Sequence, residues 1–453
     1  MKLFINAAAT EYACLSHTYR KAAYRMEIHV VQSGETVISI ARMYNVSPQK
    51  IVTDNGLENQ NTLTVGQALL IQFPETVHTV QQGETLTGIA AQYGTTVLAL
   101  QQNNPQLTTQ PALFPGEQIT ITYRGERTRE VSINGYAYPH INPNVLLRSL
   151  PFLTMLTIFG YGFTETGELI EIDDQPLINM AYQFRVAPIM LLSSITEDGN
   201  FSGERASLLF QNTAFQNAVI DRIIQTMWQK GYLGLDVDFE YINPEDADAF
   251  IEFLRNITAR LNAEGFTVNV DLAPKVSGDQ PGLLYEAHDF PRAGAIANTV
   301  LLMTYEWGFS HGPPMAVAPL DQVRRVVNYA VTVIPTEKIF MGVPNYGYVW
   351  RLPYQRGISV APSIGNQLAV EIAAQYQAEI QFDERAQSPF FYFTNQEGFR
   401  HVVWFEDVRS IQAKWNLIDE NNLLGAGYWT VMRPFAQNWA YINGRYTIRK
   451  IVE

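Results

Sequence analysis

The sequence predicts an α/β protein, a (β/α)8 TIM barrel with a small α+β insertion after strand 7, preceded by two small βααβ modules. Two observations carry this prediction. From residue 131 onward, short apolar runs alternate with helical segments, which is the pattern of a parallel sheet covered by helices on both faces. Before that point, residues 28–122 contain one sequence pattern twice, which indicates a pair of structural repeats.

The repeats align most clearly at their beginnings. The segment HVVQSGETVISIARMY is followed, 49 positions later, by HTVQQGETLTGIAAQY. Each copy then closes with a Gly-Gln or Gly-Glu turn and a short apolar strand, VGQALLI and PGEQITI. This order predicts strand, helix, helix and strand in each copy, over residues 28–73 and 77–122.

Both copies resemble LysM modules, the small domains that bind N-acetylglucosamine-containing polymers such as peptidoglycan and chitin. The resemblance rests on V-x-x-G-[DE]-T-x-x-x-I-A, a later Asn and a G-[QE] turn. It implies that sugar lies in a shallow groove beside the loop after the first strand. The residues of that loop are Gly34, Glu35, Thr36 and, in the second copy, Gly83, Glu84, Thr85. The same triplet also suits a turn followed by a capped helix N-terminus, and the two roles are compatible.

Length and composition limit the classes of function. The chain has 453 residues, 47% of them hydrophobic, which is enough for several domains and a large core. Its formal net charge of −13 argues against nucleic acid and anionic membrane surfaces as partners. Cys14 is the single cysteine, so the chain can form neither an internal disulfide nor a cysteine metal cluster.

The barrel follows a charged linker, RGERTRE. We expect it to span residues 130–453, with strands in the runs VSINGYA, FLTMLTIFG, APIMLLS, LGLDVDF, FTVNVDL, TVLLMTY, KIFMGVP and GAGYWTV. Eight such strands alternating with helices predict a (β/α)8 barrel. Residues 351–406 are too long for a simple loop and contain the strand-like pieces IQFDE, PFFYFT and HVVWFE, which predicts the inserted subdomain.

The fourth run carries the chemistry. In LGLDVDFEY, Asp236, Asp238 and Glu240 occupy alternate positions of an apolar stretch. A strand has a side-chain period of two, so all three carboxylates project from one face. Burying three acids is costly unless they are paired or protonated. Because a helix follows, they lie at the C-terminal end of the strand, where barrels of this kind place their active sites.

These residues resemble glycoside hydrolase family 18. LGLDVDFEY is similar to the family's D-G-x-D-x-D-x-E motif, LMTYEW to its M-x-Y-[DN] segment, and GYWTV places a tryptophan where the family has its barrel-floor tryptophan. The match spans residues 131 to about 440 in the family's strand order. Two positions depart from the pattern: Leu233 replaces the first Asp of the motif, and Glu306 stands where Asp or Asn is usual.

The resemblance implies retaining hydrolysis of a β-linked N-acetylhexosaminide in which the substrate supplies its own nucleophile. Glu240 would be the general acid and then the general base. Asp238 would hold the 2-acetamido group, and Asp236 would tune both acids. Tyr305 would donate to the acetamido oxygen, and Trp429 would form the floor under the sugar. Further candidate substrate contacts are Met303 and Glu306.

Alternatives remain at this stage. Clustered carboxylates also bind Mg²⁺ or Ca²⁺, although no His-rich metal spacing appears and no cofactor is expected. A chitinase would share every catalytic residue named. A wall-binding lectin is the non-enzyme alternative, and Glu240 argues against it because such lectins usually lack the acid.

Module order, the insertion and phrases such as RAQSPFFYFT and RPFAQNW resemble the spore-cortex fragment-lytic N-acetylglucosaminidases. We therefore expect a peptidoglycan or chitin-like partner, cell-wall or spore coat and cortex localisation, and no membrane partner, since no apolar run reaches the ~18 residues that span a bilayer. Residues 1–27 are expected to be a tail without a convincing signal peptide, and the start is Met1 or Met26. The oligomeric state is not predicted.

Overall fold

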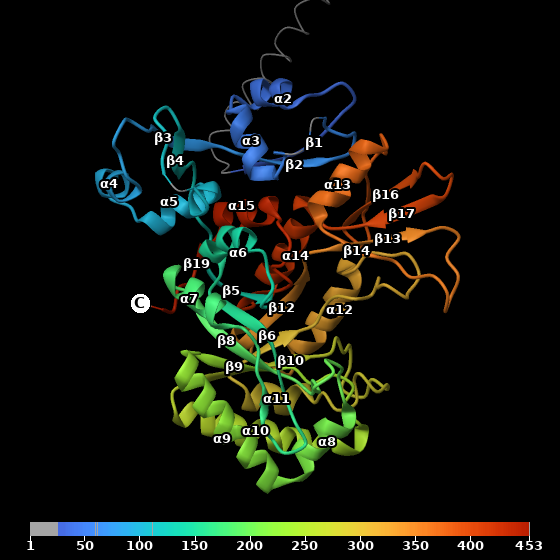
Figure 1. Ribbon diagram of the computed structural model, residues 1–453. Coiled ribbons are helices and arrows are strands. Elements are labelled where there is room, and N and C mark those ends of the chain that lie inside the picture. The colour runs from blue at the N-terminus through green and yellow to red at the C-terminus, as the bar shows by residue number, and fades with distance from the viewer. Residues whose placement is uncertain (1–25, 59, 61, 111, 453) are drawn as a thin grey trace, which may run out of the picture.

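Two small modules precede the barrel in the computed structural model, which describes residues 26–58, 60, 62–110 and 112–452 (Figure 1). Module 1 consists of β1 (Met26–Val30), α2 (Val37–Tyr44), α3 (Pro48–Asn55) and β2 (Ala68–Gln72), and module 2 of β3 (Pro74–Thr79), α4 (Leu86–Gln92), α5 (Val97–Asn103) and β4 (Gln118–Tyr123). In each module the two strands pair antiparallel. The predicted βααβ order is confirmed.

The first strand begins earlier than the predicted tail allows. Met26 and Glu27 pair with Gln72 and Ile71 in the ladder of module 1, so these two residues belong to the module. The rest of the predicted tail, residues 1–25, lies outside the described residues.

Within the described chain, eight parallel strands form the predicted closed barrel. They are β5 (Glu130–Ala137), β6 (Met155–Phe163), β8 (Ala187–Leu192), β9 (Gly234–Val237), β10 (Thr267–Leu272), β11 (Thr299–Leu302), β12 (Ile339–Pro344) and β18 (Gly425–Trp429). Pairing of β5 with both β6 and β18 closes the ring. Every residue of β8 and β9 is buried, as expected for strands packed on both faces.

Helices cover the outside of the barrel (Figure 1). They are α6 (Pro143–Ser149), α7 (Gln175–Gln183), α8 (Gly203–Gln211), α9 (Thr213–Lys230), α10 (Ala247–Ala263), α11 (Phe290–Ile296), α12 (Leu320–Ala330), α14 (Val408–Glu420) and α15 (Ala436–Arg445). Gly231 ends α9 in the left-handed conformation at φ +84° and leads into β9, as the sequence predicts. Among the described helices, none has the length and apolar character needed to cross a bilayer.

The insertion between β12 and α14 is a five-stranded antiparallel sheet with one covering helix. Its strands are β13 (Gly347–Arg351), β14 (Ser363–Ile364), β15 (Gln381–Asp383), β16 (Ser388–Thr394) and β17 (Arg400–Trp404), and its helix is α13 (Asn366–Gln375). The sheet begins at Gly347, ahead of the predicted start at about residue 351, because β13 pairs with β17 and is integral to it.

Both modules are docked on α15, which lies between them and the barrel (Figure 1). The Gln437 amide donates to Asn55 Oδ1 at 2.9 Å and to the Ala68 carbonyl at 2.7 Å in module 1. The Asn443 amide donates to Asn103 Oδ1 of module 2 at 2.9 Å. Ala68 and Leu70 of module 1 also belong to the apolar core of the barrel. The modules and the barrel therefore share one packed interior.

Candidate active site

The three acids of the fourth barrel strand lie at its C-terminal end, as predicted. Asp236 is within β9, which ends at Val237. The Asp238 backbone N–H still donates to the Leu192 carbonyl at 3.0 Å, so the strand geometry continues one residue further. Asp236 is fully buried, Asp238 is 5% exposed, and Glu240 is half-buried.

A hydrogen-bond network inside the barrel holds the innermost acid. The Tyr136 hydroxyl lies 2.7 Å from Asp236 Oδ2 and 2.9 Å from Asp271 Oδ1. The Asn269 amide donates to the same two carboxyls, at 2.7 and 2.9 Å. A hydroxyl has one proton, so it can donate to one carboxylate and must accept from the other. The arrangement therefore calls for a proton on one of the two carboxyls.

Burial raises the pKa of these carboxyls. The pKa of Asp236 is raised by burial, although hydrogen bonds from Asn269 and Tyr136 oppose the shift. The pKa of Asp271 is raised well above its ordinary value by burial and by the charges of Asp236 and Asp238. Water is excluded and negative charges are adjacent, so the protonated forms are favoured.

The two outer acids differ in their surroundings. Burial and the charges of Glu240 and Asp236 raise the pKa of Asp238 well above its ordinary value, and its Oδ1 has no hydrogen-bond partner among the described residues. Burial and the charge of Glu306 raise the pKa of Glu240. A carboxyl that stays protonated toward neutral pH can donate that proton.

A buried histidine fixes the backbone between the two outer acids. His288 accepts from the Ala273 N–H at 2.7 Å through Nδ1, and its Nε2–H donates to the Phe239 carbonyl at 3.1 Å. Burial lowers its pKa to about 4, so the ring is neutral, as this pattern of one acceptor and one donor requires. Sequence reasoning gave His288 no role.

Tyr305 and Met303 lie beyond the end of β11 (Thr299–Leu302). Burial and the charges of Asp271 and Asp238 raise the pKa of Tyr305 well above its ordinary value, so its hydroxyl keeps its proton and can donate. Met303 is 8% exposed and belongs to an apolar cluster against which Tyr305 and Trp429 pack. Tyr305 is thus brought to the acids, while Met303 lies mostly beneath the surface.

A cleft of about 520 Å³ includes Glu306, whose charge raises the pKa of Glu240, although none of the three acids of the fourth strand lines it. It is lined by Tyr138, His140, Glu306, Asn345, Tyr346, Tyr348, Ser363, Trp429, Thr430, Met432 and Arg433. The Trp429 indole packs edge-on against Phe159, with ring centroids 5.4 Å apart. The segment after β12 supplies one wall of this cleft through Tyr346 and Tyr348, which add to the aromatic surface of Tyr138 and Trp429.

Glu306 is held in the cleft wall by that insertion. The Tyr346 hydroxyl donates to Glu306 Oε1, and the Tyr348 hydroxyl lies 3.1 Å from the same oxygen. The backbone at Glu306 has φ +65°, a conformation that non-glycine residues rarely adopt and that is enriched at functional sites. Burial raises its pKa, and the two tyrosines oppose the shift.

Some site residues that were not predicted lie in alternating patterns that the sequence shows. Asn269 and Asp271 alternate in the apolar strand FTVNVDL, which is the same pattern that identified the acids of β9. Tyr346 and Tyr348 alternate directly after the seventh strand. Tyr136 had no such signal, because it meets Asp236 only through barrel closure.

In the two modules, the predicted sugar-contact residues form turns and helix caps. Gly34 and Gly83 have φ of +83° and +86°, which favours glycine. Thr36 and Thr85 accept from backbone N–H groups as N-caps of α2 and α4. Their neighbours Glu35 and Glu84 each accept from a backbone N–H and from a histidine, His29 at 2.8 Å and His78 at 2.7 Å.

A metal site is the alternative role for clustered carboxylates. Among the described residues, no group of three or more His, Cys, Asp or Glu side chains is arranged to hold a metal ion. The carboxyls of β9 and β10 are instead joined through Tyr136 and Asn269.

Comparisons with known proteins agree with this geometry. A family model described as Glycosyl hydrolases family 18 matches residues 135–433, and the LysM domain model matches residues 29–72 and 78–122. The Cortical fragment-lytic enzyme of Bacillus cereus is 37% identical over 432 residues, which are 94% of this chain and 99% of that protein.

Solved structures give the same result. The Bacillus cereus spore cortex-lytic enzyme SleL has a TM-score of 0.81 at 36% identity and covers 95% of this chain and 100% of its own. A chitinase from Chromobacterium violaceum ATCC 12472 shares the fold, with a TM-score of 0.64 at 23% identity over 69% of this chain and 98% of its own. The chain belongs to glycosyl hydrolase family 18 and carries two LysM domains before its catalytic barrel.

Proposed function

We propose that the protein is a retaining N-acetylglucosaminidase that cleaves peptidoglycan fragments of the spore cortex during germination and acts in the cortex or cell wall. The observation that carries the proposal is the row of Asp236, Asp238 and Glu240, with pKa values raised by burial, at the edge of an aromatic cleft. Relatives named for cortex lysis align over nearly the whole chain, which supports cortex peptidoglycan over chitin.

Glu240 is the general acid in this proposal. Its carboxyl is half-buried, and its raised pKa keeps the proton available for the leaving glycosidic oxygen. The substrate's acetamido oxygen attacks the anomeric carbon as the glycosidic bond breaks, so the first intermediate is a cyclic oxazolinium ion. Glu240, now a carboxylate, then takes a proton from water, whose oxygen attacks the same carbon and restores the original configuration.

Asp238 and Tyr305 orient the acetamido group. A carboxyl at Asp238 can accept from the amide N–H, and as a carboxylate it stabilises the positive charge of the intermediate. Its unpartnered Oδ1 leaves one oxygen without a protein donor. Tyr305, whose hydroxyl keeps its proton because its pKa is raised, donates to the acetamido oxygen and holds it against the anomeric carbon.

The proton shared by Asp236 and Asp271 controls the negative charge around Asp238. Asp236 and Asp271 contact the same Tyr136 hydroxyl and Asn269 amide, so a proton on either carboxyl reduces the negative charge that Asp238 experiences. When the positive intermediate forms, Asp238 becomes a carboxylate by passing its own proton to Asp236, while the shared proton stays on Asp271. Trp429 and Met303 provide the apolar floor under the sugar, and Glu306 contacts its hydroxyl groups.

The LysM modules bind the glycan beside the loops of Gly34-Glu35-Thr36 and Gly83-Glu84-Thr85, and the two surfaces differ. The adjacent loop of module 1 is covered, because Thr64 donates to the Ala378 carbonyl at 2.9 Å and is 6% exposed. Aligned on the Gly-Gln and Gly-Glu turns, the position of Thr64 corresponds to Phe114 in module 2, which is 59% exposed. We propose that module 2 presents the larger open glycan surface.

Replacing the proposed acid is the first test. We expect Glu240→Gln to lower turnover of cortex muropeptides by about 100-fold or more, because an amide cannot donate the required proton. Mass spectrometry should show wild-type products that end in reducing N-acetylglucosamine, and Glu397→Gln, an exposed glutamate of the insertion, should match the wild type. Cleavage of chitin oligosaccharides alone would indicate a chitinase, and binding of both substrates without cleavage would indicate a lectin.

The buried acids make stability depend on pH. Burial raises the folded-state pKa values of Asp236, Asp238 and Asp271 above the ordinary value of about 3.9, so the folded protein binds more protons than the unfolded chain. Stability from these groups is therefore greatest below about pH 4 and is lost as the pH rises through the folded-state pKa values.

Asp271→Asn removes one of these groups without changing its shape. For Asp271→Asn, we expect the free energy of unfolding to decrease less between about pH 5 and about pH 8 than it does for the wild type. Guanidinium unfolding at both pH values measures this difference. Asp173→Asn, at an exposed position, is the matched control and should follow the wild type. An undiminished fall in Asp271→Asn would contradict the shared-proton account.

The open surface of module 2 can be tested with a single truncation. We expect Phe114→Ala to weaken cosedimentation with purified sacculi roughly threefold or more, because sugar rings pack on exposed aromatic faces. Trp228→Ala on α9 is the matched control, since Trp228 is 60% exposed and lies on the outside of the barrel. Equal binding by the two variants would refute a role for Phe114.

A further inference from the structure

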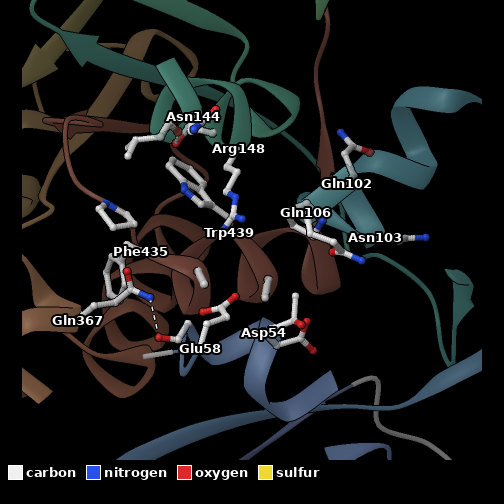
Figure 2. A pocket seen from close by; sticks show the side chains of 18 of the residues that line it. Asp54, Glu58, Gln102, Asn103, Gln106, Asn144, Arg148, Gln367, Phe435 and Trp439 are labelled. Carbon is white, nitrogen blue, oxygen red and sulfur yellow. Dashed lines mark hydrogen bonds between the residues drawn. The ribbon is translucent and has the colours of Figure 1, made fainter. Parts of the chain in front are cut away.

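A second cavity, of about 390 Å³, lies where both LysM modules and the barrel meet (Figure 2). Amide side chains line much of it, namely Gln72, Gln102, Asn103, Gln106, Asn142, Asn144 and Gln367. Trp439 and Phe435 provide an apolar side. Four of these amides, Gln72, Gln102, Asn103 and Gln367, donate to backbone carbonyls, which fixes their orientation. A cavity lined by amides suits a ligand with several hydrogen-bonding groups, such as a peptide or a sugar.

Opposite charges line this junction cavity on different sides. Arg148 of α6 extends into it beside Trp439, while Asp54 and Glu58 of module 1 lie on the other side (Figure 2). Glu371 of α13 is a further lining carboxylate. Arg148, Glu58 and Glu371 have no ion pair or side-chain hydrogen bond among the described residues. Glu58 and Arg148 are exposed and Glu371 is half-buried, so a ligand that carries both a carboxylate and an ammonium group could pair with them from the cavity.

Two buried polar atoms of the lining also lack partners. Asp54 is 4% exposed, and its Oδ1 accepts from Lys50 at 2.7 Å, but its Oδ2 has no hydrogen bond among the described residues. The same holds for Gln106 Oε1. Buried acceptors without donors are costly, but both oxygens are covered, so a ligand in the cavity would reach them only if the lining side chains moved.

The cavity and the catalytic cleft are lined by neighbouring parts of two loops. Tyr138 and His140 line the cleft, and Asn142 and Asn144, a few residues further along, line the cavity. In the same way, Arg433 lines the cleft and the next residues, from Pro434 onward, line the cavity. The same two loops therefore contribute residues to both spaces.

We propose that the junction cavity binds a short peptide with free ammonium and carboxylate groups, of the kind that peptidoglycan carries on its glycan chain and chitin lacks. The peptide carboxylate pairs with the planar Arg148 guanidinium, and the ammonium group lies between Glu58 and Glu371. The proposal deepens the proposed function on which it rests, because it assigns recognition of peptide-bearing glycan to module 1, the barrel and the insertion together.

The test is a calorimetric titration of the full chain with the tripeptide L-alanyl-γ-D-glutamyl-meso-diaminopimelate. We expect binding to the wild type that weakens about tenfold or more in Arg148→Gln, which is ~1.4 kcal/mol, and that also weakens in Glu371→Gln. Arg148 is exposed at the cavity, so its replacement spares the core. Arg255→Gln, at an exposed position of α10 on the far side of the barrel, is the matched control and should retain the wild-type affinity.

The result separates this proposal from the proposed function. The tripeptide contains no glycosidic bond, so its binding reports on the cavity whether or not the enzyme cleaves cortex fragments. Equal affinity of the wild type and Arg148→Gln would overturn the proposal, as would the absence of tripeptide binding. Displacement of bound tripeptide by chitotetraose in the Glu240→Gln background would also overturn it, because the ligand of the cavity would then be the sugar chain.

Discussion

The site depends on a hydroxyl placed between two buried carboxyls. Tyr136 lies within hydrogen-bond distance of both Asp236 and Asp271, and the three residues come from three different strands of the barrel. This contact requires the ring to close, since β5 meets β9 only across the barrel interior. It permits two acids to remain in a water-free core, because they need only one proton and one hydroxyl between them.

The positions of the outer acids, Asp238 and Glu240, follow from this hydrogen-bond network. Asp238 and Glu240 follow Asp236 on the same extended segment, and His288 bonds to the Phe239 carbonyl that lies between them. The charges of these acids in turn help to keep Tyr305 protonated. Packing and electrostatics thus act in the same direction, since burial fixes the geometry and also keeps protons on the groups that have to donate them.

The LysM modules are structural parts of the enzyme. Gln437 and Asn443 of α15 join the two modules to the barrel, and part of module 1 lies in the barrel core. A flexible tether would raise the local concentration of the enzyme at the polymer. Rigid docking instead fixes the position of each module relative to the barrel.

Most of the fold could be predicted from the sequence, because its strands and modules follow regular, repeated patterns of residues. The eight apolar runs predict the barrel strands, and the repeated Gly-Glu-Thr segments predict the modules. Alternation in LGLDVDFEY predicts the row of acids. Contacts between segments that are far apart in the sequence could not be predicted. Nothing local distinguishes the covered Thr64 from the open Phe114, and β13 was missed because it is a strand only through pairing with β17.

The most direct test of the account concerns the proton on Glu240, measured as the pH dependence of kcat/KM on a soluble fragment. Burial and the charge of Glu306 raise the pKa of Glu240, so Glu306→Gln should lower that pKa. The account predicts that the alkaline limb of the profile, where the acid loses its proton, moves to lower pH in Glu306→Gln and stays in place in Glu397→Gln. An alkaline limb at the same pH in all three proteins would contradict it.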